Sequence, residues 1–252
     1  MIELKNVSGG YGEKTVLRDI TIRFPQGVVT VLLGSNGCGK STLLKTALGL
    51  MPAFSGTILY DGQEIRSMTP RAIAQKAAYL SQSRNIPNIT AGRMVLHGRF
   101  PHLSYPRHYS RQDREIVREA LEKTGSLDLS DRQMNELSGG QRQKIYVSMA
   151  LAQQAQTIFM DEPTTYLDVR HQLEMMRIAK ELAQGGTAVV MVLHDLSLAL
   201  RFGDQIAVLE QGQLAQIGTP EEVFESGVLD RVFDVRVCRV ETEDGFHYYC
   251  QT

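Results

Sequence analysis

The sequence has few of the features that mark secreted, membrane-spanning or nucleic-acid-binding proteins. Its 252 residues include only three cysteines, Cys38, Cys238 and Cys250, without metal-ligand spacing, so we expect reduced thiols in a cytosolic protein. No apolar run approaches the roughly 18 to 20 residues that cross a bilayer, and residues 1–5 do not resemble a secretory signal. The formal net charge of −1 provides no overall field for nucleic acid, so we expect no nucleic-acid partner.

The charges are nevertheless unevenly distributed along the chain. Residues 66–118 carry ten Lys or Arg against two carboxylates, whereas the chain from Thr219 onward is acidic. Two interpretations of the basic segment stay open, a solvated face and a patch that meets an acidic partner or lipid headgroups.

A glycine-rich segment lies between an apolar strand and a helix. Residues 28–33 predict a strand buried on both faces, and residues 42–48 predict a helix. Between them, three glycines let backbone N–H groups converge on an anion at the positive end of the helix dipole. Lys40 supplies a point charge for the β- and γ-phosphates, and Ser41 supplies a hydroxyl ligand for Mg²⁺. The predicted nucleotide-binding residues of this loop are Gly34, Ser35, Asn36, Gly37, Cys38, Gly39, Lys40, Ser41 and Thr42.

Three more polar segments directly follow predicted strands. Gln82 follows the strand at 77–80, the pair Asp161 and Glu162 follows the strand at 157–160, and His194 follows the strand at 188–193. Ligands bind at the carboxyl ends of strands in open α/β sheets, so these side chains and Gly34 should meet at one edge. Asp161 is expected to hold the Mg²⁺ shell, Glu162 to polarise the attacking water, and His194 to bond the γ-phosphate. A structural hydrogen bond is the alternative for a histidine taken singly.

A second glycine pair opens a helix in mid-chain, in the segment Ser138, Gly139, Gly140 and Gln141. Ser138 and Gln141 form the pattern of a capping box. Each glycine costs the helix about 1 kcal/mol, so something other than stability favours the pair. Uncovered N–H groups at a helix N-terminus make a phosphate site. Because Gly34 to Ser41 already serves one triphosphate, we expect this second site to serve a nucleotide held by another copy of the chain.

The remaining segments fill in the architecture. Residues 19–24 alternate polar and apolar, and residues 57–60 end in a hairpin-type turn, which together suggest an antiparallel β layer. Pro87, Pro101 and Pro106 interrupt the region that follows Gln82, and Ser110 caps a helix with one apolar stripe, as a helical insertion would. A hairpin is predicted at 207–215, and a helix after Thr219.

Two further predictions concern Tyr11 and Cys38. Tyr11 lies in a predicted flexible loop, residues 8–12, where an adenine ring could stack on it, although an ordinary loop tyrosine is the alternative. Flanking N–H groups are expected to lower the pKa of Cys38, and bound nucleotide is expected to block its alkylation.

These motifs together resemble the nucleotide-binding subunit of ABC transporters over nearly the whole chain. The resemblance implies an α/β fold, a P-loop NTPase (RecA-like) core with an antiparallel β subdomain and an inserted α-helical subdomain. The core with its β subdomain would comprise 1–85 and 155–252, and the helical subdomain, which carries the signature, 86–154. Tyr166 and Thr157 depart from the usual residues of the family. Neither change touches the chemistry.

The resemblance also implies cofactors and roles. ATP and Mg²⁺ are the implied cofactors, with Ser41, Gln82 and Asp161 arranging the metal. Glu162, His194 and Gln82 are the implied catalytic residues. Tyr11 matches the adenine-stacking aromatic, and Leu167 with Asp168 matches the loop that touches a second copy. Two copies are expected to close head to tail around two ATP molecules, each bound by one copy's phosphate loop and the other's signature.

Partners and location follow from the same resemblance. We expect integral membrane permease subunits, indirectly a solute-binding protein, and a peripheral position on the cytoplasmic face of the plasma membrane. Segments 97–102 and 161–168 resemble those of importers of ferric siderophores, haem or cobalamin, and importers of other metal chelates would look similar. The alternative is the soluble ABC-type ATPase of iron-sulfur cluster assembly. A chromosome-structure ATPase is excluded because the roughly 55 residues after Gln82 are too few for its long coiled coil.

Overall fold

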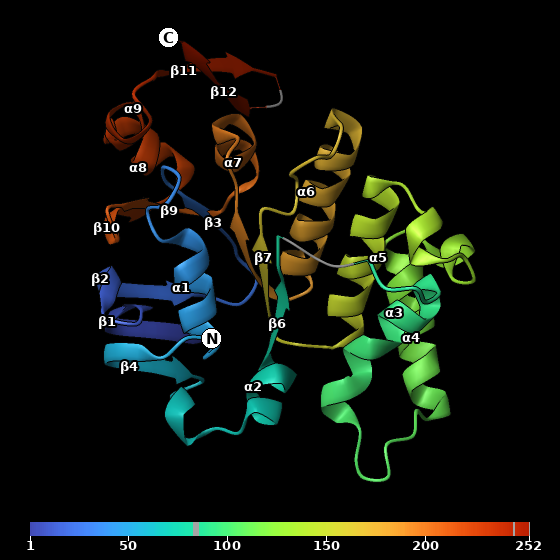
Figure 1. Ribbon diagram of the computed structural model, residues 1–252. Helices are drawn as coiled ribbons and strands as arrows, with labels where there is room; N and C mark the ends of the chain where they lie inside the picture. The colour runs from blue at the N-terminus through green and yellow to red at the C-terminus, as the bar shows by residue number, and fades with distance from the viewer. Residues whose placement is uncertain (83–85, 244, 252) are drawn as a thin grey trace.

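The computed structural model describes residues 1–82, 86–243 and 245–251. Its centre is a six-stranded sheet in the order β10-β9-β3-β8-β7-β6 (Figure 1). The strands are β3 (Val29–Leu33), β6 (Ala77–Leu80), β7 (Thr157–Asp161), β8 (Ala188–Val192), β9 (Gln205–Glu210) and β10 (Gln213–Gly218). All are parallel except β10, which pairs with β9 as the predicted hairpin. Every residue of β3, β7 and β8 is buried, as their apolar runs predicted.

An antiparallel sheet forms the predicted second β layer, in the order β2-β1-β4-β5. Its strands are β1 (Ile2–Tyr11), β2 (Lys14–Phe24), β4 (Ala53–Tyr60) and β5 (Gln63–Glu64). The predicted flexible loop at 8–12 was wrong, because residues 8–11 belong to β1 and Tyr11 pairs with Lys14. A Cβ on Gly10 would lie 1.9 Å from the carbonyl oxygen of Lys14, so this glycine permits close strand pairing.

The central sheet is covered on both faces. On one face, α1 (Lys40–Ala47) and the antiparallel sheet enclose a core in which Phe24 meets Phe159 edge to face, with ring centroids 5.5 Å apart. On the other face, α6 (Val169–Gln184) and α7 (Leu196–Phe202) pack over the alternate residues of the same strands. Because β3, β6, β7, β8 and β9 are parallel, their carboxyl ends lie at the same edge of the sheet.

Between β6 and β7 the chain is helical, as predicted. The elements are α3 (Ala91–Leu96), α4 (Arg111–Lys123) and α5 (Gly139–Ala152), with short 3-10 turns η2 (His97–His102), η3 (Leu127–Leu129) and η4 (Met134–Glu136). The turn η1 (Ile65–Ser67) and α2 (Pro70–Lys76) precede β6. Figure 1 shows α3, α4 and α5 grouped beside β6, on the side away from α1. Ser110 caps α4 through a capping box, as expected. The boundary predicted after residue 85 lies outside the described residues.

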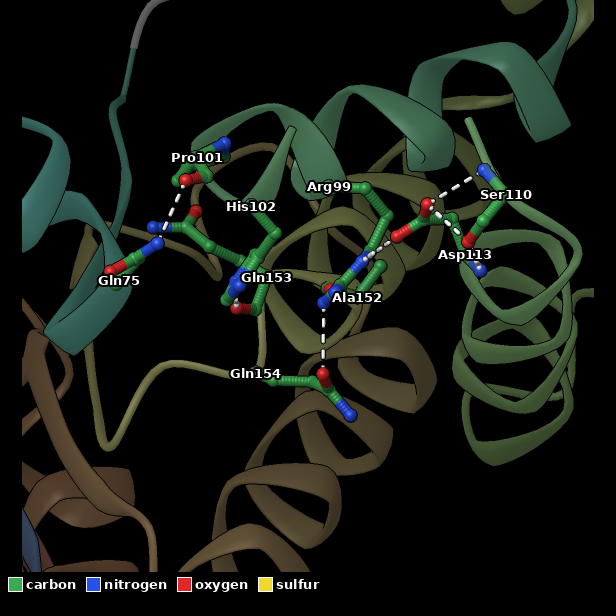
Figure 2. Close-up of polar contacts among 9 residues, drawn as sticks. All are labelled: Gln75, Arg99, Pro101, His102, Ser110, Asp113, Ala152, Gln153 and Gln154. Carbon is green, nitrogen blue, oxygen red and sulfur yellow. Dashed lines mark hydrogen bonds and ion pairs between the residues drawn. The ribbon is translucent and has the colours of Figure 1, made fainter. Parts of the chain in front are cut away.

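A buried polar cluster lies at the end of α5 in this helical region (Figure 2). Arg99 donates to Asp113 Oδ1 at 2.8 Å and to the carbonyl oxygen of Ala152, at the end of α5, at 2.8 Å. The next residue, Gln153, donates to the carbonyl oxygen of Ala77 at 3.1 Å, at the start of β6. The far end of α5 is thereby held against the edge strand that leads to Gln82.

The C-terminal segment packs beside α7. Its elements are α8 (Pro220–Glu225), α9 (Val228–Phe233), β11 (Arg236–Thr242) and β12 (Gly245–Gln251). Thr219 caps α8 as predicted, whereas the β11–β12 hairpin, which contacts α7 through β12, was not anticipated. In the part of the chain that the structure describes, no helix combines the length and apolar character that crossing a bilayer requires.

Candidate functional site

The glycine-rich loop turns tightly between β3 and α1. Gly34 has φ of 148°, and a Cβ there would lie 2.3 Å from the carbonyl oxygen of Leu209, so only glycine fits. Gly39 precedes α1 with φ of 113°. Lys40 is 6% exposed, and its ammonium donates to the carbonyl oxygens of Gly34 at 2.7 Å and Ser35 at 3.0 Å. The loop thus places a fixed positive charge beside the first amides of a helix, which is an anion-binding arrangement.

A cavity of about 300 Å³ opens over this loop. Its lining comprises Tyr11, Lys14, Val16, Asn36, Gly37, Gly39, Lys40, Ser41, Thr42 and Glu162. Tyr11 is 52% exposed at the end of β1, so its ring is available at the mouth. Lys14 and Val16 of β2 were not predicted, because nothing in the local sequence of β2 connects it to a loop further along the chain.

Asp161 is buried beside the cavity, and hydroxyl groups bind both of its carboxylate oxygens. Ser41 Oγ donates to Oδ1 at 3.0 Å, and the hydroxyl of Tyr79 donates to Oδ2 at 3.1 Å. Hydroxyl and carboxylate oxygens are the donors that Mg²⁺ prefers, so Ser41 and Asp161 fit a magnesium ion. The structure brings this predicted pair together, whereas the side chain of Gln82 contacts Glu162.

Glu162 lies at the centre of the three residues predicted to be catalytic. Its Oε2 accepts a hydrogen bond from Gln82 Nε2 at 2.5 Å, and its Oε1 lies 2.6 Å from His194 Nε2. Thr165 Oγ1 also donates to Oε2, at 3.2 Å, a contact that the sequence did not suggest. A carboxylate oriented in this way, at the wall of the cavity, is suited to accept a proton from an attacking water.

The signature segment has the predicted capping box, with Ser138 N donating to Gln141 Oε1 at 3.0 Å and Gln141 N to Ser138 Oγ at 3.3 Å. A Cβ on Gly139 would meet nothing within 4 Å, so the first amide of α5 is uncovered. Among the residues that the structure describes, those lining the 300 Å³ cavity do not include 138–141. Figure 1 shows α1 and α5 on different sides of β6 and β7.

The expectation that flanking N–H groups lower the pKa of Cys38 was wrong, whereas the expectation that bound nucleotide blocks its alkylation stays a prediction. The side chain is 6% exposed, and burial raises the pKa of its thiol, although Lys40 Nζ, 3.9 Å from Sγ, acts in the opposite direction. The loop amides alone therefore do not make this thiol reactive. The protein itself already covers it.

The segment between Glu162 and α6 begins buried, at Pro163 and Thr164, and becomes exposed at Tyr166 and Asp168. Tyr166 is 98% exposed with φ of 64°, and Asp168 caps α6 by accepting from His171 N at 2.9 Å. Asp168 Oδ1 also lies 2.8 Å from His171 Nδ1. Hydrogen bonds from His171 lower the pKa of the Asp168 carboxyl. This loop leads directly from the Glu162 cluster to the surface.

The fold and the site define a P-loop nucleotide hydrolase: a parallel sheet, a glycine-rich loop before a helix, and a paired aspartate and glutamate at the end of a neighbouring strand. Comparison with known proteins narrows the class. Residues 17–165 match the family model described as ABC transporter, so the chain belongs to the ABC transporter family. As a member of that family it binds nucleotide and is an ATPase.

Individual relatives match along almost the entire chain. The petrobactin import ATP-binding protein FpuD of Bacillus anthracis is 39% identical over 97% of this chain and 90% of its own length. The iron(3+)-hydroxamate import ATP-binding protein FhuC of Bacillus subtilis (strain 168) is 40% identical over 90% of this chain and 85% of its own. A metal-chelate type ABC transporter in an inward-facing conformation has a TM-score of 0.86 at 25% identity, covering 99% of this chain and 96% of that chain.

Proposed function

We propose that this chain is the ATP-hydrolysing subunit of an importer of iron chelates, coupling ATP hydrolysis to uptake through a separate permease. The main observation that supports this proposal is the cluster of Gln82, Glu162 and His194 at the wall of the nucleotide cavity. In this assignment Glu162 accepts the proton of the attacking water, and Gln82 and His194 fix its two oxygens. When ATP is bound, His194 would donate to the γ-phosphate instead of to Glu162.

The phosphate loop and its neighbours bind the nucleotide in this proposal. Lys40 and the loop amides hold the β- and γ-phosphates, and Tyr11 stacks on the adenine. Ser41, Asp161 and Gln82 would hold Mg²⁺, which supplies charge neutralisation on the phosphate oxygens when bound. The fit of Ser41 and Asp161 to a hard oxygen-loving cation supports this assignment.

Two copies of the chain would complete each site. The uncovered amide at Gly139 and the N-cap residue Ser138 would face the γ-phosphate held by the phosphate loop of the second copy. The separation of 138–141 from the cavity within one chain supports this arrangement. Among similar solved structures is the dimeric ABC transporter cassette MJ0796, with a TM-score of 0.75 at 28% identity, covering 87% of this chain and 99% of that chain.

The helical segment 86–154 would act as one unit and dock on the permease. A cavity of about 400 Å³ between α3 and α4 supports this role, because basic Arg93, Arg114 and Arg118 line it together with apolar Leu96 and Val117. The permease would hold the chain peripherally on the cytoplasmic face of the membrane, and a solute-binding protein would act indirectly through that permease.

The names of the relatives support an iron-chelate solute. Petrobactin and hydroxamate import are named for two relatives, and hemin import is named for the HmuV protein of Rhodococcus jostii (strain RHA1), which is 40% identical over 88% of this chain. The solute itself touches the permease and the solute-binding protein. Uptake of a siderophore, haem or cobalamin-type solute is therefore assigned to the assembled transporter.

A pair of variants tests the hydrolytic assignment. Glu162→Gln should bind ATP without turnover and accumulate as a dimer in light scattering, whereas Lys40→Ala should lose productive ATP binding. In a chain with its native cysteines replaced by serine, Ser35→Cys and Ser138→Cys on different copies should crosslink when ATP is present. Normal turnover in Glu162→Gln or Lys40→Ala would contradict the roles, and crosslinking that never joins the two copies would contradict the dimer.

A second experiment separates import from iron-sulfur cluster assembly. Deleting the gene should abolish uptake of a radiolabelled ferric siderophore, and the tagged chain should purify with an integral membrane protein. Uptake of molybdate provides the matched control. Recovery of the chain only with a soluble scaffold, together with unchanged iron uptake, would favour the cluster-assembly alternative.

A further inference from the structure

The hydroxyl of Tyr79 binds the oxygen of Asp161 that Ser41 leaves unoccupied. Asp161 is 4% exposed, so little water reaches its carboxylate. Ser41 Oγ donates to Oδ1 at 3.0 Å and Tyr79 donates to Oδ2 at 3.1 Å. A buried carboxylate oxygen is unfavourable without a hydrogen-bond donor, so the Tyr79 contact favours one orientation of the Asp161 side chain.

The position of the Tyr79 hydroxyl is set by strand pairing and packing. In the parallel register of β6 and β7, Tyr79 lies beside Phe159, two residues before Asp161. Its ring packs against the core between the central sheet, α1 and the antiparallel sheet. The hydroxyl is therefore carried on a rigid, packed ring rather than on a flexible stem, which favours one orientation of the carboxylate.

We propose that Tyr79 is a positioning residue for the magnesium site, acting through Asp161; this inference rests on the proposed function of Ser41 and Asp161. By binding Oδ2, Tyr79 keeps Oδ1 directed at the Ser41 hydroxyl. The two oxygens that would coordinate the metal, Asp161 Oδ1 and Ser41 Oγ, are thereby kept next to each other. Tyr79 is not one of the residues that line the nucleotide cavity. Loss of such an outer partner typically lowers metal affinity or activity by about 10- to 100-fold.

The test compares Tyr79→Phe with the wild-type full chain, using Mn²⁺ as a spectroscopic substitute for Mg²⁺. Phenylalanine keeps the packed ring and removes only the hydroxyl. Mn²⁺ is titrated in the presence of ADP and followed by electron paramagnetic resonance, and ADP binding is measured separately in EDTA. We expect Mn²⁺ to bind about tenfold more weakly to the variant, while metal-free ADP binding stays unchanged.

Tyr60→Phe is the matched control. Tyr60 belongs to the same core, is 1% exposed, and donates to the carbonyl oxygen of Ala47 at 2.9 Å, so its variant also loses one buried hydrogen bond. It should lower the melting temperature without changing Mn²⁺ affinity. Equal Mn²⁺ affinity in wild type and Tyr79→Phe would overturn the proposal, as would failure of Tyr79→Phe to fold while Tyr60→Phe folds. Absence of any metal-dependent nucleotide binding in the wild type would instead refute the proposed function.

Discussion

The imidazole of His171 lies directly against Gly140, so that a Cβ on Gly140 would be 2.5 Å from His171 Cδ2. The preceding glycine, Gly139, has open space where its Cβ would be. The two glycines of the signature thus have different physical reasons to be small. Gly140 accommodates a side chain of its own protomer, whereas Gly139 leaves an amide of α5 uncovered.

Alanine substitutions should separate these two reasons. Gly140→Ala forces His171 away and should destabilise the fold by about 1–3 kcal/mol through overpacking, reduced by the roughly 1 kcal/mol that alanine adds to helix propensity. The double variant with His171→Ala should recover that loss. Gly139→Ala should keep or raise stability and lower ATPase activity. Urea denaturation measures the first effect, and equal stability of the two single variants would contradict the steric explanation.

Tyr11 should contribute to nucleotide affinity through its exposed ring. Tyr11→Ala should weaken binding of a fluorescent ATP analogue by roughly 5- to 150-fold, since stacking of a base on an aromatic ring is worth about 1–3 kcal/mol. Tyr11→Phe should bind as wild type does. Tyr249→Ala removes a comparably exposed ring, 44% exposed, from the C-terminal hairpin and serves as the control. Unchanged affinity in Tyr11→Ala would show that the ring makes no contact with adenine.

Cys38 should be the slow thiol of the three, even without nucleotide. Its side chain is 6% exposed and burial raises the pKa of its thiol, so both access and thiolate are limited at neutral pH. Burial and the carboxylates of Asp195 and Asp230 also raise the pKa of Cys250, so its greater exposure is what should make it react sooner. Iodoacetamide labelling followed by mass spectrometry, from pH 7 to pH 10, should show exposed Cys250 reacting first. In denaturant all three thiols should react alike. Rapid labelling of folded Cys38 at neutral pH would restore the view that the loop amides activate it.

The buried Arg99–Asp113 ion pair should contribute far more to the free energy of unfolding than an exposed ion pair does. Asp113→Asn leaves the buried guanidinium without its counter-charge and should cost about 3–5 kcal/mol in urea denaturation. Glu115→Gln breaks the exposed pair with Arg111 on the same helix and should cost at most about 0.5 kcal/mol. Similar small losses in both variants would contradict the importance of burial.

The same pair gives stability a pH dependence. Burial raises the pKa of the Asp113 carboxyl, but hydrogen bonds from Arg99 and Ser110 outweigh it and hold the pKa below its usual value. The stabilisation is therefore fully present above the unfolded-state pKa of about 3.9 and is lost as the pH falls through the folded-state value. Wild type should lose more stability than Asp113→Asn between pH 5 and the acid range, and parallel losses would refute the linkage.

The sequence predicted correctly those features that follow from the order of apolar strands and polar residues along the chain. Gln82, Asp161 and His194 each follow an apolar run, and parallel pairing of those runs brings their ends to one edge, so the cluster at Glu162 was foreseeable. The prediction was wrong for residues 8–12, where the glycines were taken as the mark of a flexible loop. The segment before Tyr11 is a paired strand, because its glycine permits the close approach of β2.

The sequence by itself determined the family, the phosphate loop and the order of the polar residues along the sheet edge, because each depends on short spacings and on the alternation of apolar runs. Only the tertiary structure decided which side chains act on those residues: Tyr79 on Asp161, His171 on Gly140, and the surrounding core on the thiol of Cys38. The spacing of residues along the chain does not predict these contacts. They arise from packing between separate elements, where burial and close approach set both orientation and pKa.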